Sequence, residues 1–250
     1  MRIQDFNPIM DAIYLFSNYI NQIANLCFSQ YSFSMVTSHP TLYFTARLHI
    51  FGNFCVNYYV DDPFSTNVSL QYFRDATVAV AGTGFDTITM SLDNPFQATL
   101  ISENSTPLGP VPKSKLCLPL FAYIPSVQDA SVIRARHFNV KAECFNYILY
   151  HVPVFPDTPV YITTTASRVR FSTTTQEFNL TAEAGQCSTV GYGLEQTQFR
   201  ILLKPRLFFS SLPLITGKYI GFYATTISGC LMVVPTNSLL VSYLVHFLPF

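Results

Sequence analysis

Histidines and carboxylates are the residues from which catalytic chemistry would first be expected. The five histidines, His39, His49, His137, His151 and His246, form no HExxH pair. No GxSxG elbow occurs, and the AGTGF segment, residues 81–85, lacks the lysine of a phosphate-binding loop. Asp61 and Asp62 are adjacent, so in a strand they would point to opposite faces. The sequence therefore predicts no enzyme, no cofactor and no metal site.

Composition restricts the remaining classes of function. The 250 residues are 49% hydrophobic, and 14 Lys and Arg balance 14 Asp and Glu. With no overall basic field, any contact with nucleic acid must be local. The six cysteines are scattered without zinc spacing, which indicates buried hydrophobes in a reducing compartment. No apolar run reaches the roughly 18 residues of a membrane span, so no membrane partner is expected.

The first half of the chain contains the patterns of two helices, which would position the side chains of any functional site. Asn7 and Pro8 predict the start of a helix that continues to residue 23, with Asn7 as its cap. A second, shorter helix is predicted over residues 70–79, and strand-like alternation fills the segments between and after the two helices.

The same order begins again in the second half of the chain. Asn139 predicts the cap of a helix over residues 140–152, and Pro205 predicts the start of a shorter helix that Pro213 ends. Because both halves share this plan, we expect an α+β protein with two topologically similar domains, each with two helices packed on antiparallel β-sheets. The predicted domains are residues 1–123 and 131–250, joined by a connector at residues 124–130.

Basic residues are sparse, and several fall on the predicted helices. These are Arg74, Lys141, Lys204 and Arg206. Because the apolar stripe of each helix packs on the strands, the basic residues are expected on the outer, polar face. Two interpretations stay open: a solvated helix surface, or a common surface that faces DNA phosphates without reading sequence.

Several short stretches carry a resemblance to a known family. SMVTSH (Ser34 to His39), followed by Thr41 and Leu42, is similar to a segment of the sliding clamps of the proliferating cell nuclear antigen type and their checkpoint relatives. The NVSL stretch at residues 67–70, the FDTITM strand at residues 85–90 and the tail around Leu248 and Pro249 resemble the same family. The repeated order of elements extends this resemblance over nearly the whole chain.

The resemblance implies a DNA-clamp fold and a function without chemistry. A clamp of this kind encircles duplex DNA as a ring, independently of sequence, and serves as a DNA polymerase processivity factor in replication and repair. Expected partners are double-stranded DNA, DNA polymerase and other clamp-binding proteins, and the expected assembly is a homotrimer or a heterotrimer. The expected location is the nucleus or a viral replication site.

The resemblance also assigns two further sets of residues. A groove for partner peptides would be lined by Met35, His39, Leu42, Ile124, Pro125, Val127 and Pro249. The subunit interface would pair the edge of residues 115–123 with the edge of residues 177–183 of the next copy. Its residues would be Lys115, Leu118, Leu120, Phe178, Leu180 and Glu183.

Departures from the family pattern keep two alternatives open. The first predicted helix carries no Lys or Arg, although clamp helices normally present basic residues to DNA. One alternative is a subunit of a heterotrimeric checkpoint-type clamp. The other, from a different class, is a structural β-rich viral protein that has no DNA role.

Overall fold

The computed structural model of the protein describes residues 1–39, 41–81, 87–94, 96–106, 109–122, 132–153, 158–193, 197–226 and 229–249. Contacts divide the chain into two compact units. The first combines Met1–Ser38 with Arg47–Ser126, and the second combines His39–Ala46 with Val127–Phe250. The predicted connector, residues 124–130, lies outside the described residues, and the predicted domain boundaries stay predictions.

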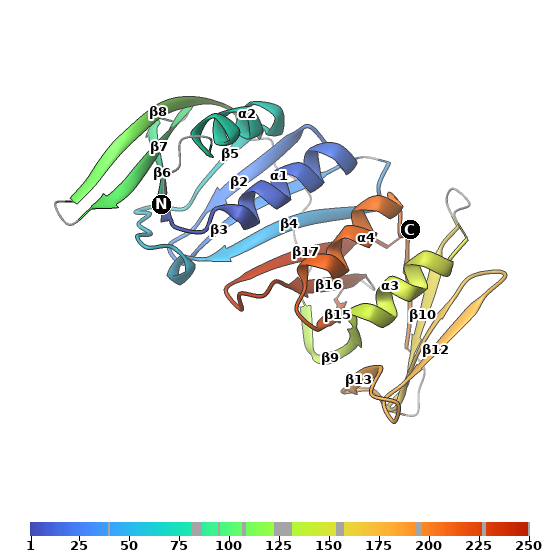
Figure 1. Ribbon diagram of the computed structural model, residues 1–250. Helices are drawn as coiled ribbons and strands as arrows, with labels where there is room; N and C mark the ends of the chain where they lie inside the picture. The colour runs from blue at the N-terminus through green and yellow to red at the C-terminus, as the bar shows by residue number, and fades with distance from the viewer. Residues whose placement is uncertain are drawn as a thin grey trace. The chain divides into compact units, whose positions relative to one another are not determined.

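The first unit is built on antiparallel strands. Their order is β1 (Arg2–Ile3), β6 (Thr87–Asn94), β7 (Gln97–Thr106), β8 (Gly109–Phe121), β5 (Phe64–Ser69), β2 (Ile23–Phe28) and β3 (Ser32–Ser38). Helices α1 (Asn7–Tyr19) and α2 (Leu70–Ala81) contact each other and lie on the same face of these strands (Figure 1). The first unit therefore has one helical face.

Helix α1 forms because its apolar residues fall on one stripe. Ile9, Ala12, Ile13 and Phe16 are buried at the i, i+3, i+4, i+7 spacing of an amphipathic helix. The predicted end at residue 23 is wrong, because Ile23 begins β2 and pairs with Ser69 of β5. The predicted cap is also wrong: Phe6 occupies the cap position, and the Asn7 backbone N–H donates to Asp5 Oδ1 at 3.1 Å.

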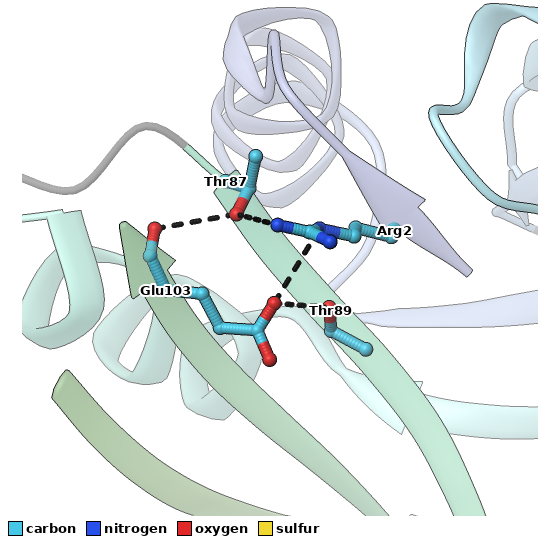
Figure 2. A network of polar contacts seen from close by, with 4 residues as sticks. All are labelled: Arg2, Thr87, Thr89 and Glu103. Atoms are coloured by element: carbon cyan, nitrogen blue, oxygen red, sulfur yellow. Dashed lines mark hydrogen bonds and ion pairs between the residues drawn. The ribbon is translucent and has the colours of Figure 1, made fainter. Parts of the chain in front are cut away.

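A polar network holds the short strand β1 against β6 and β7 (Figure 2). Arg2 Nε lies 3.4 Å from Glu103 Oε2, and Arg2 Nη2 donates to Thr87 Oγ1 at 3.4 Å. Thr89 Oγ1 donates to the same Glu103 oxygen at 3.3 Å. Because both charged side chains are largely shielded from water, the network ties β1 to strands distant in sequence.

The second unit has two groups of antiparallel strands. One has the order β13 (Cys187–Val190), β9 (Val132–Lys141), β15 (Tyr219–Thr225), β16 (Cys230–Pro235) and β17 (Val241–Phe247). The other is a four-stranded sheet in the order β12 (Glu177–Thr181), β11 (Arg168–Ser172), β10 (Val160–Thr164) and β14 (Thr197–Ile201). Helices α3 (Ala142–His151) and α4 (Arg206–Ile215) contact each other (Figure 1). The predicted α+β class is confirmed.

Phenylalanines fill the core of the second unit. Phe145 of α3 packs on Phe171 of β11 and on Phe222 of β15, with ring centroids 6.3 and 5.7 Å apart. Phe222 also stacks on Phe138 of β9 at 4.9 Å. These contacts join α3 to both groups of strands.

Residues 39–46 fall inside the range predicted as the N-terminal domain, yet they pack with the second unit. Phe44, the first residue of β4 (Phe44–Phe51), lies against Phe208 and Phe209 of α4 and Phe247 of β17, with centroids 5.2 to 6.1 Å apart. The backbone N–H of Leu248 donates to the carbonyl of Tyr43 at 2.9 Å. The aromatic contacts explain the grouping.

The helix boundaries in the second unit differ from the prediction. Asn139 is not a cap: it lies in β9, and its Nδ2 donates to Ser188 Oγ at 3.2 Å. Helix α3 begins after Lys141, which occupies the cap position. Pro213 does not end α4 but lies inside its last turn, which continues to Ile215.

Within the described residues, no helix is long and apolar enough to cross a membrane, and no group of three or more His, Cys, Asp or Glu could hold a metal ion. Cys27, Cys55, Cys117, Cys144, Cys187 and Cys230 are all free thiols. Burial raises the pKa of the Cys187 and Cys230 thiols, so both stay protonated in the core.

Candidate functional site

The outer helical face of the first unit is nearly devoid of positive charge. Helix α1 exposes Asp11 and Tyr14, and α2 exposes Tyr72 and Asp75. Arg74 is the basic residue of α2, in the middle of the helix and only half-exposed. Partial desolvation of the exposed Asp11 carboxyl by its neighbours, followed by the charge of Asp5, raises its pKa. This face offers a polyanion little attraction.

The three predicted DNA-facing basic residues of the second unit lie at the N-terminal ends of its helices rather than along them. Lys141 directly precedes α3, and Lys204 lies in the connection before α4. Arg206 is the first residue of α4; its guanidinium donates to the Tyr150 carbonyl and lies 5.9 Å from the centre of the Tyr150 ring. The expectation that Lys141 and Lys204 sit on helices is therefore wrong.

A lysine that the sequence interpretation missed lies beside Lys141. The backbone N–H of Ala142 donates to the carbonyl of Lys218 at 3.0 Å, which places Lys218 next to the start of α3. Lys141 and Lys218 both line a hollow of about 470 Å³ whose other walls include Asn146 and Leu214. We call this feature the lysine hollow. Lys218 precedes a strand in sequence, and only the fold reveals its proximity to α3.

Charge in the lysine hollow is only partly balanced. Lys141 Nζ lies 3.6 Å from Glu143 Oε1, whereas Lys218 Nζ lies 5.6 Å from the centre of the Tyr219 ring. Because Glu143 is strongly exposed, its attraction for Lys141 is weakened by water. The walls of the hollow therefore include two lysines, whose ammonium groups are of the type that binds an oxygen anion such as a phosphate.

Four tyrosines lie at exposed positions on three of the helices. Tyr14 and Tyr72 lie on the helices of the first unit, and Tyr147 and Tyr150 lie on α3, each with more than half of its surface exposed. A tyrosine combines an aromatic face with a hydroxyl that can donate a neutral hydrogen bond. These side chains were not singled out from sequence, although their helical spacing would have allowed it.

Two strand edges carry the predicted interface residues. Among the described residues, β12 pairs only with β11, and β8 pairs with β5 only at Leu120 and Phe121. An unpaired edge presents backbone donors and acceptors to another strand. Both edges are thus open to pairing along part of their length.

The individual interface residues differ in exposure. Lys115 is exposed on β8, while Leu118 and Leu120 are buried in the first unit. Phe178 is half-buried and Leu180 is buried on β12. Glu183 is exposed in the turn after β12, beyond the end of the strand at Thr181.

The structure agrees only in part with the lining predicted for the peptide groove. Met35 is wrong as a surface residue, because its side chain on β3 is 0% exposed. His39 closes a turn: its Nδ1 lies 2.8 Å from Thr41 Oγ1, and its carbonyl accepts the N–H of Leu42 at 2.9 Å. Leu42 is half-buried. The predicted lining residues Ile124, Pro125 and Val127 lie outside the described residues.

Two segments that carry predicted groove residues meet within the second unit. The hydrogen bond from Leu248 to Tyr43 brings the end of the chain beside the His39 turn, and Pro249 is exposed there. Tyr43, which the sequence interpretation missed, is 46% exposed at the same place. An aromatic side chain and a proline next to a turn can receive an apolar residue of a partner.

No family model and no curated protein matches the chain. Among solved structures, the chain is similar to the crystal structure of PCNA from Thermococcus kodakaraensis. The two are 11% identical in sequence and superpose with a TM-score of 0.71, and the match covers 100% of this chain and 99% of that one. The chain therefore has the fold of the PCNA-type sliding clamp, over its whole length and with strongly diverged side chains.

Proposed function

We propose that this chain, which has the fold of the PCNA-type sliding clamp, is a subunit of a ring that encircles duplex DNA and serves as a DNA polymerase processivity factor. The observation that carries the proposal is the structural match to the Thermococcus PCNA, which covers this chain and the PCNA chain almost entirely. Both units of this chain therefore have a counterpart in PCNA. A ring stays on DNA topologically, so its inner surface needs only weak, sequence-independent phosphate contacts.

The sparse basic residues are compatible with that role. Lys141 and Lys218 in the lysine hollow, with Arg206 and Lys204 near the start of α4, would supply phosphate contacts from the second unit. Arg74 would supply one from the first unit. A charge-neutral chain can serve as a clamp because closure of the ring, rather than affinity, provides retention.

Ring formation would use the open edges of β8 and β12. Pairing the β8 edge of one copy with the β12 edge of the next is a head-to-tail contact, which closes into a ring when the rotation allows. We propose a homotrimer. Clients would dock where the His39 turn, Tyr43 and Pro249 meet, and the expected location is the nucleus or a viral replication site.

Threading onto DNA with a single free end tests the proposal without a loading enzyme. Linear duplex is attached to beads at one end, and the protein is added before or after the free end is blocked by a bulky protein. Retention after a high-salt wash is expected only when the end is blocked after addition. Equal retention in both orders would mean ordinary surface binding and would exclude a ring.

Solution mass gives the second arm of the test. Light scattering is expected to give three times the chain mass of 28.2 kDa. A monomer that neither threads nor is retained on DNA would contradict a self-sufficient clamp and favour a subunit of a mixed ring.

A further inference from the structure

The four-stranded sheet of the second unit has one face covered by a helix and one face that is polar. Phe171 of β11 packs on Phe145 of α3, and Phe178 of β12 packs on Tyr147 of the same helix. Phe171 and Phe178 are register partners, so they lie on the same, helix-covered face. Because side chains alternate along a strand, Arg168 and Arg170 lie on the opposite face.

Strand register gathers basic and hydroxyl side chains on that polar face. Arg170 is opposite Thr163 of β10 and Asn179 of β12. Arg200 of β14 is opposite Tyr161 of β10, on the same face. The face therefore combines three arginines from two non-adjacent strands, in a chain that has only 14 Lys and Arg in total.

A hollow of about 350 Å³ lies on this face, and we call it the arginine hollow. Its walls include Arg168 and Arg170, the hydroxyl side chains of Thr163, Thr165 and Ser167, and the polar residues Glu177 and Asn179. The hydroxyls come from β10 and from the turn that joins β10 to β11. The walls of the hollow therefore combine two guanidinium groups and three hydroxyls with one carboxylate; the Asn179 amide donates to that carboxylate at 2.7 Å, and Thr165 Oγ1 donates to the Arg168 carbonyl at 3.4 Å.

The charges of the arginine hollow are not balanced. Arg170 Nη1 lies 3.6 Å from Glu177 Oε2, with 38% and 48% of the two side chains exposed. Arg168 is exposed, and no carboxylate lies within ion-pair distance of it among the described residues. Two guanidinium groups two residues apart on one strand face can converge on one anion, which would relieve their mutual repulsion.

The donor set favours a phosphate group over a carboxylate. One arginine satisfies the two oxygens of a carboxylate, whereas a phosphate monoester presents three oxygens and about two negative charges. Arg168, Arg170 and the surrounding hydroxyls supply more donors than a carboxylate can use. The hollow also has room for part of the chain that carries the phosphate.

Nucleic acid fits this face less well. Single strands bind through exposed aromatic platforms, and Tyr161, the aromatic residue among the register partners named above, is only half-exposed. A continuous phosphate backbone would also pass close to Glu177, which repels it. A single phosphate can instead sit on the Arg168 side of the hollow.

We propose that the arginine hollow binds a phosphorylated serine or threonine side chain of a partner protein. The site does not depend on ring formation. Pairing of the β12 edge with another strand would use backbone groups in the plane of the sheet, whereas these side chains project from its face. It is also distinct from the lysine hollow, because α3 covers the opposite face of the same sheet.

Fluorescence anisotropy with the full chain tests the proposal. The probe is a labelled Gly-Ala-phosphoSer-Ala-Gly peptide, and the comparison probes are the same peptide with serine or glutamate and a labelled oligothymidylate. The phosphopeptide is expected to bind at least about tenfold more tightly than either unphosphorylated peptide. Arg168→Gln is expected to weaken phosphopeptide binding by about tenfold, since it removes a charge-assisted contact.

Two further variants make the test specific. Glu177→Gln is expected to strengthen phosphopeptide binding, because it removes the negative charge beside the site, whereas a merely structural Glu177 would give no gain. Lys141→Gln, a charge-matched control in the lysine hollow, is expected to leave phosphopeptide binding unchanged. The proposal is overturned if the glutamate peptide or the oligothymidylate binds as well as the phosphopeptide, or if Arg168→Gln has no effect.

Discussion

At the scale of single residues, burial changes the chemistry that the sequence suggests. Met35 belongs to the stretch with the closest family resemblance, yet it is fully buried. His39 forms a turn with Thr41, whereas His49 is half-buried, with its Nδ1 2.9 Å from Ser34 Oγ and its ring edge-on to Phe51. His39 therefore shapes an exposed turn, whereas His49 is packed between a serine and a phenylalanine.

His49 predicts a dependence of stability on pH. Burial, followed by the charge of Arg47, lowers the pKa of His49 in the folded state. In the unfolded chain the pKa of this histidine returns to about 6.5, so below that pH the unfolded chain binds more protons than the folded one. The contribution of His49 to the free energy of unfolding is therefore complete above about pH 6.5 and is lost as the pH falls below it. Urea denaturation from about pH 7.5 to about pH 5.5 should show the loss.

His49→Gln keeps a hydrogen-bonding group opposite Ser34 and removes the titration. The variant is expected to flatten the pH dependence in this window. His151→Gln on the exposed end of α3 serves as the control and should leave it unchanged. An equally steep loss of stability in the His49→Gln variant would assign the titration to another group.

Phe44 predicts a large stability effect. Its ring is 1% exposed and stacks on Phe208 at 5.6 Å, so Phe44→Ala removes the aromatic anchor of residues 39–46. We expect a loss of about 3 to 5 kcal/mol in the free energy of unfolding. Tyr43→Ala, at a neighbouring exposed position, should cost much less, and equal losses in urea denaturation would contradict this role of Phe44.

At the scale of elements, the helices carry much less charge on their exposed faces than the predicted function suggested. Positive charge lies at the starts of α3 and α4, and tyrosines occupy exposed positions along α1, α2 and α3. A lysine at a helix N-terminus opposes the helix dipole, so its presence there is not explained by helix stability. Phosphate contact offers an explanation for Lys141 in the lysine hollow.

The lysine hollow predicts a specific change in salt dependence. The double variant Lys141→Gln, Lys218→Gln removes two cations, and each phosphate contact contributes about 0.9 to the slope of log K against log salt. The slope is therefore expected to become shallower by about 2 units. It is measured by anisotropy with labelled duplex from about 50 to 200 mM salt.

Arg168→Gln is the charge control for that experiment, because it lies on the opposite face of the sheet from α3. It should leave the slope for duplex DNA unchanged. If the lysine double variant binds duplex with an unaltered slope, the lysine hollow does not contact phosphates.

At the scale of the whole molecule, the open edges of β8 and β12 are the features from which an assembly would be built. Lys115 and Glu183 are exposed near these edges, and an exposed ion pair contributes about 0 to 1 kcal/mol. Lys115→Glu should therefore weaken the proposed contact between copies by up to about fivefold and shift the mass at low protein concentration towards the monomer.

Adding Glu183→Lys to Lys115→Glu restores opposite charges and is expected to restore the mass. Glu143→Lys combined with Lys115→Glu makes the same overall change of charge at a different place and should not restore it. Recovery with both second substitutions would indicate an effect of net charge rather than a contact between Lys115 and Glu183.

Sequence periodicity by itself determined much of the architecture. The stripe of α1, the shorter helices and the strand order predicted an α+β chain with a repeated plan, because residues that share a face of one element are a few positions apart. Caps and ends were predicted less well. Asn7 and Asn139 have the right residue type for a cap, but one lies inside a helix and the other inside a strand.

Only the tertiary structure decided which distant residues meet. The register of β10 with β14 and β11 places Arg200 on the face of Arg168, and a backbone hydrogen bond places Lys218 beside α3. The aromatic contacts of Phe44 assign residues 39–46 to the second unit. Strand register and packing depend on contacts between segments far apart in the chain, and a periodic pattern within one segment carries no information about them.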